Sequence, residues 1–190
     1  EWNNGFGSAN SIHLGDVISG KIKGKTDVDY FRIDWQDIPE SSIIALIDID
    51  AQVNGSALDA MICLYDRNHV ELACNDDSNG LDSLIYAKLL HHSSYGPYFI
   101  RVQDLNYPNE GGDAYTYTLA VYRPLLISAV KGGSVGGVQF TSGDALSHYK
   151  FADGTEKWML FFDASDVGLK GNLVALTKDY HAKGIYLTLN

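Results

Sequence analysis

A series of short runs rich in β-branched and aromatic residues, each followed by turn-forming residues, most constrains the fold of this chain. In residues 115–122, tyrosine, leucine and valine alternate with threonine and alanine, as a strand with one buried face requires. Similar runs occupy residues 30–35, 43–50, 61–65 and 98–103. Clusters of Gly, Asn, Asp and Pro separate the runs, and no long stretch has apolar residues at helical spacing. The sequence therefore predicts an all-β protein, either a β-sandwich or a barrel.

A change in charge near Arg123 and Pro124 predicts a domain boundary. Residues 1–123 hold 18 acidic and 8 basic side chains, whereas residues 124–190 hold 6 of each. The second segment again consists of strand-like runs, but at about 67 residues it is marginal as an independent domain. We therefore expect it to pack against the first domain, to pair with another copy, or to be one unit of a longer array.

The acidic first segment also excludes some classes of partner. It has no cluster of Lys or Arg that would neutralise phosphates, so neither nucleic acid nor an anionic membrane surface is an expected partner. No run approaches the ~18 consecutive apolar residues of a membrane-spanning helix, so membrane insertion is not expected either. The composition is that expected of a soluble extracellular module or of a cation-binding protein.

A polar loop at residues 75–82 has the spacing of a cation-binding loop. Asn75, Asp77 and Asn79 place oxygens at positions one, three and five, Gly80 allows a sharp turn, and Asp82 follows. Position twelve is not a glutamate and no helices flank the loop, so an EF-hand is excluded. The prediction is a Ca²⁺ loop on a β scaffold. The alternative is an ordinary turn whose side chains bond their own backbone.

The two cysteines flank a predicted hairpin turn at residues 66–69. A four-residue turn would place Cys63 opposite Leu72 and Cys74 opposite Met61, so the two sulfurs would be diagonal neighbours on one face. The expected Cα separation is about 7 Å. A disulfide usually needs Cα atoms within about 6.8 Å. A disulfide and two buried thiols therefore both stay open.

Four sequence motifs in residues 1–123 resemble one known family. Residues 27–33 match an Asp-x-Asp-Tyr-Phe core, and residues 59–77 match a hairpin that ends in Asn-Asp-Asp. Residues 96–102 resemble Gly-x-Tyr-Tyr-x-Arg-Val with Phe99 as the second aromatic residue, and residues 117–121 resemble a closing strand. In this order they resemble the bacterial pre-peptidase C-terminal domain, which is appended to many secreted peptidases. The resemblance implies a jelly-roll-like β-sandwich in residues 1–123. Residues 124–190 lie outside the resemblance, and their strand-like runs predict a small second all-β segment.

The resemblance also implies a second group of metal ligands. Some relatives, including the collagen-binding domains of clostridial collagenases, bind Ca²⁺ through the N-terminal segment and the loop before the Asp-x-Asp strand. The residues of this chain that match those positions are Glu1, Asn3, Asn4, Asp27 and Asp29. The alternative is that Asp27 and Asp29 cap a turn and face solvent.

No catalytic motif is expected to work in this chain. Residues 132–136 match Gly-x-Ser-x-Gly around Ser134, but that motif requires a strand-to-helix turn, and the sequence after it is not helical. His91 and His92 are adjacent and precede two serines, which predicts a solvated loop. We therefore expect a protein without enzymatic activity.

Two functions fit these observations. The first is an extracellular, calcium-binding accessory module, secreted or at the cell surface, that binds a polysaccharide or fibrous protein or supports a secreted parent enzyme. Exposed aromatic rings would carry such binding. The candidates are Trp2, Tyr95, Tyr107 and Trp158. The alternative is a structural subunit of a surface layer, filament or adhesin that assembles with copies of itself by strand pairing.

Overall fold

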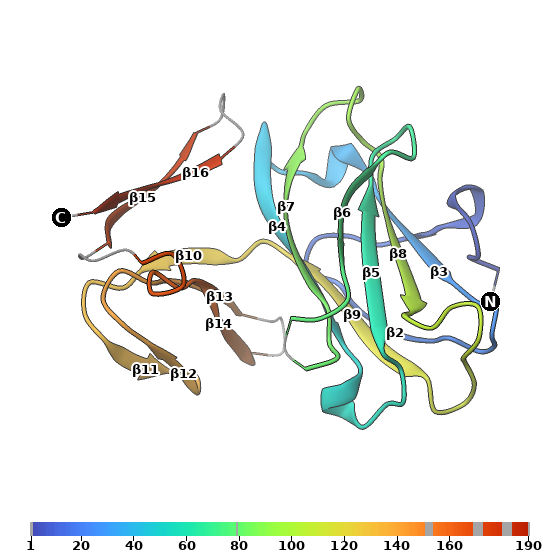
Figure 1. Cartoon of the computed structure of the whole chain (residues 1–190). Coiled ribbons are helices and arrows are strands. Elements are labelled where there is room, and N and C mark those ends of the chain that lie inside the picture. Colours follow the sequence, from blue (N-terminus) through green and yellow to red (C-terminus); the bar gives the residue numbers. More distant parts are fainter. Residues whose placement is uncertain (1, 79, 151–153, 169–172, 180–183, 190) are drawn as a thin grey trace. The chain divides into compact units, whose positions relative to one another are not determined.

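The computed structural model describes residues 2–78, 80–150, 154–168, 173–179 and 184–189. The chain divides into two compact units, Glu1–Arg123 and Pro124–Asn190. Both units consist of β-strands, so the predicted all-β class is confirmed (Figure 1). The described helices are three short 3₁₀ segments, η1 (Phe6–Ser8), η2 (Trp35–Asp37) and η3 (Gln52–Asn54), and none of them is long enough to cross a membrane.

The first unit is a sandwich of two sheets. One sheet has the order β1-β3-β8-β5-β6 and the other has the order β2-β9-β4-β7. The strands of the five-stranded sheet are β1 (Asn10–Ser11), β3 (Asp29–Ile33), β8 (Tyr98–Asp104), β5 (Ala60–Tyr65) and β6 (Glu71–Asn75). Those of the four-stranded sheet are β2 (Val17–Lys21), β9 (Thr116–Tyr122), β4 (Ser42–Asp50) and β7 (Leu84–Leu90). All pairings are antiparallel except that of β1 with β3.

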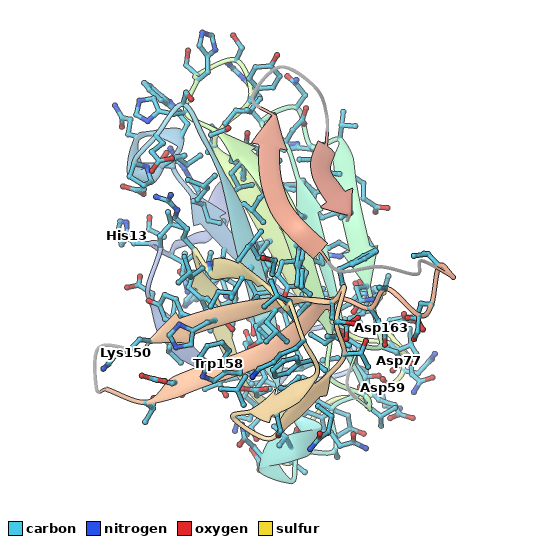
Figure 2. All side chains as sticks on the ribbon, turned by 90° about the vertical axis from the view of Figure 1, so that its left-hand side faces the viewer. His13, Asp59, Asp77, Lys150, Trp158 and Asp163 are labelled. Carbon is cyan, nitrogen blue, oxygen red and sulfur yellow. A yellow bond between two sulfur atoms is a disulfide. The ribbon has the colours of Figure 1, made fainter. Side chains whose placement is uncertain are left out.

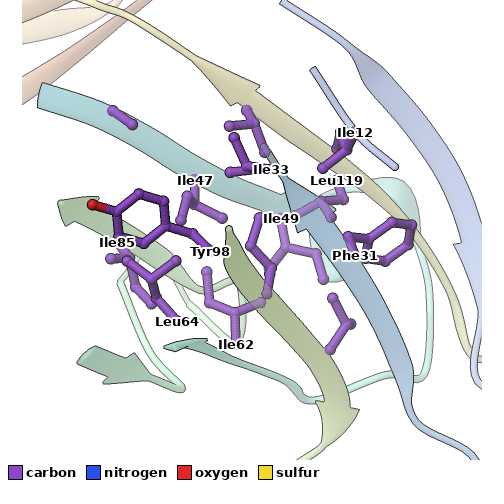
Figure 3. Close-up of a cluster of buried hydrophobic side chains, with 14 of the residues drawn as sticks. Ile12, Phe31, Ile33, Ile47, Ile49, Ile62, Leu64, Ile85, Tyr98 and Leu119 are labelled. Atoms are coloured by element: carbon purple, nitrogen blue, oxygen red, sulfur yellow. The ribbon is translucent and has the colours of Figure 1, made fainter. Parts of the chain in front are cut away.

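Alternating side chains from both sheets form the core (Figure 3). Ile62 and Leu64 of β5 face Ile47 and Ile49 of β4, and all four side chains are buried. The residues between them on β5, such as Cys63, belong to a separate cluster on the outer face of the five-stranded sheet. The period of two that the sequence shows is thus the period that buries one face of each strand.

An aromatic cluster covers part of that outer face. Phe6 of η1 lies 4.7 Å from the ring of Tyr30 and 5.3 Å from those of Tyr65 and Phe99, measured between ring centroids. On the β5–β6 turn, His69 has a positive φ of 62° and its ring stacks on Phe6 at 3.8 Å. The N-terminal segment therefore packs onto the sheet through edge-to-face and stacked rings.

The β5–β6 hairpin has a different register from the predicted one. Cys63 pairs directly with Cys74, and the two form a disulfide with a Cα separation of 4.1 Å. The predicted pairing of Cys63 with Leu72 is wrong because the turn is one residue longer and a register shift follows Leu64. The open question of disulfide or thiols is thereby answered by an irregularity that hydrophobic patterning does not encode.

The second unit contains three small sheets, β10-β13-β14, β11-β12 and β15-β16. Their strands are β10 (Leu125–Ser128), β11 (Gly133–Val135), β12 (Val138–Phe140), β13 (Ala145–Lys150), β14 (Glu156–Phe162), β15 (Leu173–Asp179) and β16 (Gly184–Leu189). The buried carboxylate of Asp144 accepts hydrogen bonds from the N–H groups of Thr141 and Ala164, at 2.6 and 2.9 Å. This unit therefore uses a buried polar group to order the loops around β13.

Candidate metal centres

The first candidate centre lies between the two sheets, where β3 begins. Asp29 is fully buried on the inner face of β3, and its carboxylate accepts a hydrogen bond from the hydroxyl of Tyr117 on β9 of the opposite sheet. The alternative that Asp29 faces solvent is therefore wrong. A buried carboxylate is costly unless hydrogen bonds or a positive charge compensate for the lost hydration.

The N-terminal segment brings an amide oxygen to the same strand. The carbonyl oxygen of Asn3 accepts the N–H of Tyr30 at 2.8 Å, which sets Asn3 beside the residue that follows Asp29. Asn3 is only 2% exposed, and its Oδ1 has no hydrogen-bond partner in the part of the chain that the structure describes. An amide oxygen of this kind is suited to a hard cation, because Ca²⁺ coordinates Asn carbonyl and carboxylate oxygens.

The other predicted ligands of this group differ in their surroundings. Asp27 is partly buried, and its carboxylate accepts the N–H of Lys23 at 2.6 Å, as a turn-capping residue does. Asn4 is exposed, and Glu1 lies outside the described residues. The fold thus brings Asn3 close to the start of β3 and leaves Asp27 at the turn that precedes it.

The 75–82 loop uses two of its predicted ligands for structure. The Oδ1 of Asn75 accepts the N–H of Leu84 at 3.0 Å, and its Nδ2 donates to the carbonyl of Asp77 at 3.1 Å. Asn79 lies outside the described residues. The side chain of Asn75 therefore closes the loop on itself, as the ordinary-turn interpretation requires.

Asp82 caps a helix that is distant in the sequence. Its Oδ1 accepts the N–H groups of Ala51 and Gln52 at 2.8 and 2.7 Å, and its Oδ2 accepts that of Val53 at 3.1 Å. These donors are the otherwise unpaired N–H groups at the start of η3. Both oxygens of Asp82 are thus engaged by the backbone at the start of η3, and the arrangement of four ligands around one ion stays a prediction.

Asp77, the remaining predicted ligand of the loop, belongs instead to a cluster of carboxylates (Figure 2). Figure 2 labels Asp77 and Asp59 of this cluster. Burial, followed by the negative charges of Asp77, Asp104, Asp76 and Glu110, raises the pKa of the Asp59 carboxyl above its ordinary value. The Oδ1 of Asp59 is buried and has no hydrogen-bond partner among the described residues. Negative charge is thus concentrated beside a partly buried carboxylate, which is the second candidate centre.

The sequence analysis did not identify Asp59 and Asp104 as part of this centre. Asp59 immediately precedes β5, and Asp104 ends β8 as the partner of Ala60. The Oδ1 of Asp104 accepts the N–H of Asn106 at 2.8 Å, and its Oδ2 lies 3.3 Å from the N–H of Asp59. The pairing of β5 with β8 brings the two carboxylates together. Only a prediction of the strand register could have identified this pair, because no sequence motif contains both residues.

The candidate aromatic residues lie in different places. Trp2, Tyr95 and Tyr107 are 96%, 51% and 42% exposed. Tyr95 precedes β8 and Tyr107 follows it, so the seven residues of β8 separate them by roughly 23 Å. Trp158 is only partly exposed, and its ring lies against Gly136, where an added Cβ would approach it to 2.5 Å. Tyr95 and Tyr107 therefore do not lie together on one flat surface.

The Gly-x-Ser-x-Gly motif lies in a β-hairpin. Ser134 is exposed in β11 and pairs with Gln139 of β12. The turn between these strands consists of Gly136 and Gly137, both with positive φ. A nucleophile elbow needs a helix after the serine, and β12 takes its place here. Ser134 thus lies on a strand of a hairpin and not at a strand-to-helix turn.

The adjacent histidines lie in an exposed loop between β7 and β8. The Nδ1 of His91 bonds to the carbonyl of Ile38, and the Nδ1 of His92 accepts the N–H of Ser94 at 3.1 Å. The predicted solvated loop is confirmed.

A solved structure that is similar to this chain is the pre-peptidase C-terminal domain of a collagenase from Bacillus anthracis. The identity is 19% and the TM-score is 0.45, and the likeness covers 60% of this chain and 93% of that one. The name of that domain is the name of the family that the sequence motifs resemble. Neither a protein-family model nor a curated protein sequence matches this chain.

Proposed function

We propose that this protein is a non-catalytic accessory module of a secreted or surface-attached protein, and that Ca²⁺ stabilises its first unit. The observation that carries the proposal is the Oδ1 of the buried Asn3, which has no hydrogen-bond partner among the described residues and lies beside the strand that bears the buried Asp29. The donor set consists of oxygen atoms only, which favours a hard cation over Zn²⁺ or Cu²⁺. Asn3 and Asp29 would hold the ion, with Glu1, Asn4 and Asp27 as the further ligands that the family resemblance implies.

Bound Ca²⁺ would supply positive charge that compensates for the burial of Asp29, and it would tie the N-terminal segment to β3. A cation at the second centre would also be stabilising, because Asp59 is partly buried among other negative charges. Asp77 and Asp59 would contact an ion there, while Asp104 orients the backbone around it.

We further propose that the loop at residues 91–97 binds a polysaccharide. Tyr95 is the exposed aromatic residue of this loop, and the ring of His92 lies 6.1 Å from it. The loop packs against the rest of the first unit, because the ring of His91 lies edge-on to that of Trp35 with 5.2 Å between the ring centroids. Arg67 of the neighbouring turn donates a hydrogen bond to the carbonyl of Ser93. An exposed flat ring on a supported loop, with the His92 imidazole beside it, offers both stacking and hydrogen bonding to a sugar.

A polysaccharide pull-down with full-length protein tests this binding. Tyr95→Ala is expected to weaken binding about tenfold, since one stacked ring contributes about 1.4 kcal/mol. Tyr107→Ala is the matched control, because Tyr107 is similarly exposed at the other end of β8. Equal losses in both variants would contradict the assignment to the 91–97 loop. Binding to a fibrous protein but to no polysaccharide would contradict the proposed polysaccharide ligand and would indicate a protein ligand instead.

One observation favours the alternative of a structural subunit. Among the described residues of the second unit, the buried apolar side chains besides Pro124 are Ala129, Ala145, Leu146 and Ala164. Three of these four are alanines, so the part of this unit whose side chains are described buries little apolar area. The edges of its small sheets also offer strands that can pair with another chain. A subunit that assembles by strand pairing would use such edges.

Residues 124–190 are therefore expected not to fold as an independent monomer. Expressed alone, this fragment should stay unfolded, aggregate or assemble with copies of itself, whereas residues 1–123 should melt cooperatively. Circular dichroism and analytical ultracentrifugation of the two fragments measure the outcome. A monomeric 124–190 fragment with a cooperative melting transition would remove the support for assembly.

A further inference from the structure

The disulfide belongs to a row of side chains that crosses the outer face of the five-stranded sheet. On β8, Arg101 pairs with Tyr30 on one side and with Cys63 on the other. Cys63 in turn pairs with Cys74 of β6, which is the edge strand of the sheet. The strand register thus places a guanidinium group directly beside the disulfide.

The two sulfur atoms have different surroundings. Cys63 is fully buried, whereas Cys74 is partly exposed on the edge strand. Nη2 of Arg101 lies 3.5 Å from the Sγ of Cys63, and the guanidinium carbon lies 5.5 Å from the centre of the Tyr65 ring. Its Nε is buried and has no hydrogen-bond partner in the described part of the chain. A positive charge therefore adjoins the buried sulfur, and the other sulfur belongs to a partly exposed residue.

An acidic side chain also lies at the disulfide. The Glu71 carboxylate and the two sulfur atoms lie within 4.8 Å of one another. Glu71 is on the same strand as Cys74, and its Oε2 lies 3.4 Å from the hydroxyl of Tyr65. Its negative charge opposes an approaching thiolate, whereas Arg101 favours a thiolate that forms on Cys63. The two charges therefore have opposite effects on the cleavage of this bond.

We propose that the Cys63–Cys74 bond is a site of thiol–disulfide exchange with an external dithiol, which attacks at Cys74. A thiolate of the dithiol bonds to the Sγ of Cys74 while the bond between the two cysteine sulfurs breaks. The electron pair of that bond leaves with the Sγ of Cys63, and Arg101 stabilises the resulting thiolate. The second thiol of the reagent loses its proton, attacks the mixed disulfide and releases Cys74 as a thiolate. The dithiol is thereby oxidised to a disulfide, and the protein is reduced by two electrons.

The location of the bond gives the exchange a structural consequence. Asn75 directly follows Cys74 and begins the loop that carries Asp77. Reduction removes the disulfide cross-link between this edge strand and the buried strand β5, which stay joined through the turn between them. The position of the second acidic centre would then depend on the non-covalent pairing of β5 with β6.

The rate of reduction of the full-length protein by dithiothreitol tests the role of Arg101. Samples are quenched with acid at successive times and their free thiols are alkylated. Mass spectrometry then measures the fraction of reduced protein from the mass that alkylation adds. Arg101→Gln is expected to slow reduction about fivefold, because the leaving thiolate loses its positive neighbour. Arg101→Lys should retain most of the rate, and Glu71→Gln should increase it. The matched control is Arg32→Gln, which removes the same charge from an exposed side chain that pairs with Asp34.

The site of attack is tested with glutathione, a monothiol that can leave a stable mixed disulfide. After brief exposure and rapid quenching, peptide mapping should find glutathione on Cys74 and alkylation on Cys63. Glutathione on Cys63 would overturn the proposal, and so would an Arg101→Gln rate equal to that of Arg32→Gln. If Arg101→Gln does not fold, the mapped adduct on the wild type and the Glu71→Gln rate decide the question. A Glu71→Gln rate below that of the wild type would also count against it.

Discussion

Replacing Gly20 with alanine is expected to destabilise the first unit by about 3 kcal/mol. Gly20 of β2 pairs with Tyr117 of β9, and a Cβ at this position would overlap with the phenol ring of Tyr117. The ring cannot move freely, because it is buried and its hydroxyl bonds to Asp29. The substitution therefore adds overpacking to the loss of a hydrogen bond on a buried carboxylate.

Urea unfolding of the full chain measures this effect, with amide exchange of β4 and β9 assigning the transition to the first unit. Gly24→Ala is the control, because a Cβ at Gly24 meets no atom within 4 Å. Tyr117→Phe, which removes the hydroxyl, should cost about 1–3 kcal/mol. The double variant should lose less than the sum of the two single losses, because both act on one contact. Strict additivity would show that Gly20 and Tyr117 are not coupled as the packing indicates.

Calcium is expected to stabilise the first unit by about 2.7 kcal/mol at a hundredfold excess over Kd. Extracellular Ca²⁺ modules bind at about 10⁻⁴–10⁻³ M, so millimolar concentrations should raise the melting temperature measurably. The rise should reach roughly 10 °C at the hundredfold excess. The physical cause is that the ion binds the folded arrangement of Asn3 and Asp29 and not the unfolded chain. A melting temperature that responds neither to chelator nor to millimolar Ca²⁺ would contradict the prediction.

Two substitutions distinguish the candidate centres. Asp27→Asn should reduce the Ca²⁺-dependent shift if the ion binds at the N-terminal segment, and Asp77→Asn should reduce it if the ion binds at the acidic cluster. Each variant keeps a side-chain oxygen that can accept a hydrogen bond. Asp113→Asn is the control, since it removes the same charge from a fully exposed side chain that pairs with Lys21. Equal Ca²⁺-dependent shifts in all three variants would exclude both assignments.

The raised pKa of Asp59 gives a further test, in which the effect of Asp59→Asn on stability differs between the cation-free and the Ca²⁺-bound protein. Because burial and the neighbouring carboxylates raise the pKa of Asp59 in the folded state, the folded protein favours the protonated carboxyl. The stability of the cation-free protein should then fall as the pH rises from the ordinary carboxyl pKa through the raised one. At pH 7, Asp59→Asn should stabilise the cation-free protein by about 0.5 kcal/mol. The same substitution, Asp59→Asn, should reduce the stabilisation by Ca²⁺ if the ion binds at the acidic cluster around Asp59.

The sequence by itself determined the fold class. Alternation of apolar and polar residues at a period of two, as in residues 115–122, is a local property that follows from the geometry of a strand. The same pattern indicated which face of β9 is buried, including Tyr117 and Leu119. The motif at residues 27–33 singled out Asp29, although only as a position that matches a family pattern.

The tertiary structure decided the roles of the individual polar residues. Asp82 occurs in a spacing typical of metal ligands, but η3 lies beside it and uses both of its oxygens. Asp59 and Asp104 are 45 residues apart, and only the pairing of β5 with β8 brings them together. The bulge after Leu64 changed a diagonal cysteine pair into a direct one. In each case a contact between distant segments decided the outcome, because strand register and loop packing depend on the sum of many contacts and no local spacing encodes them.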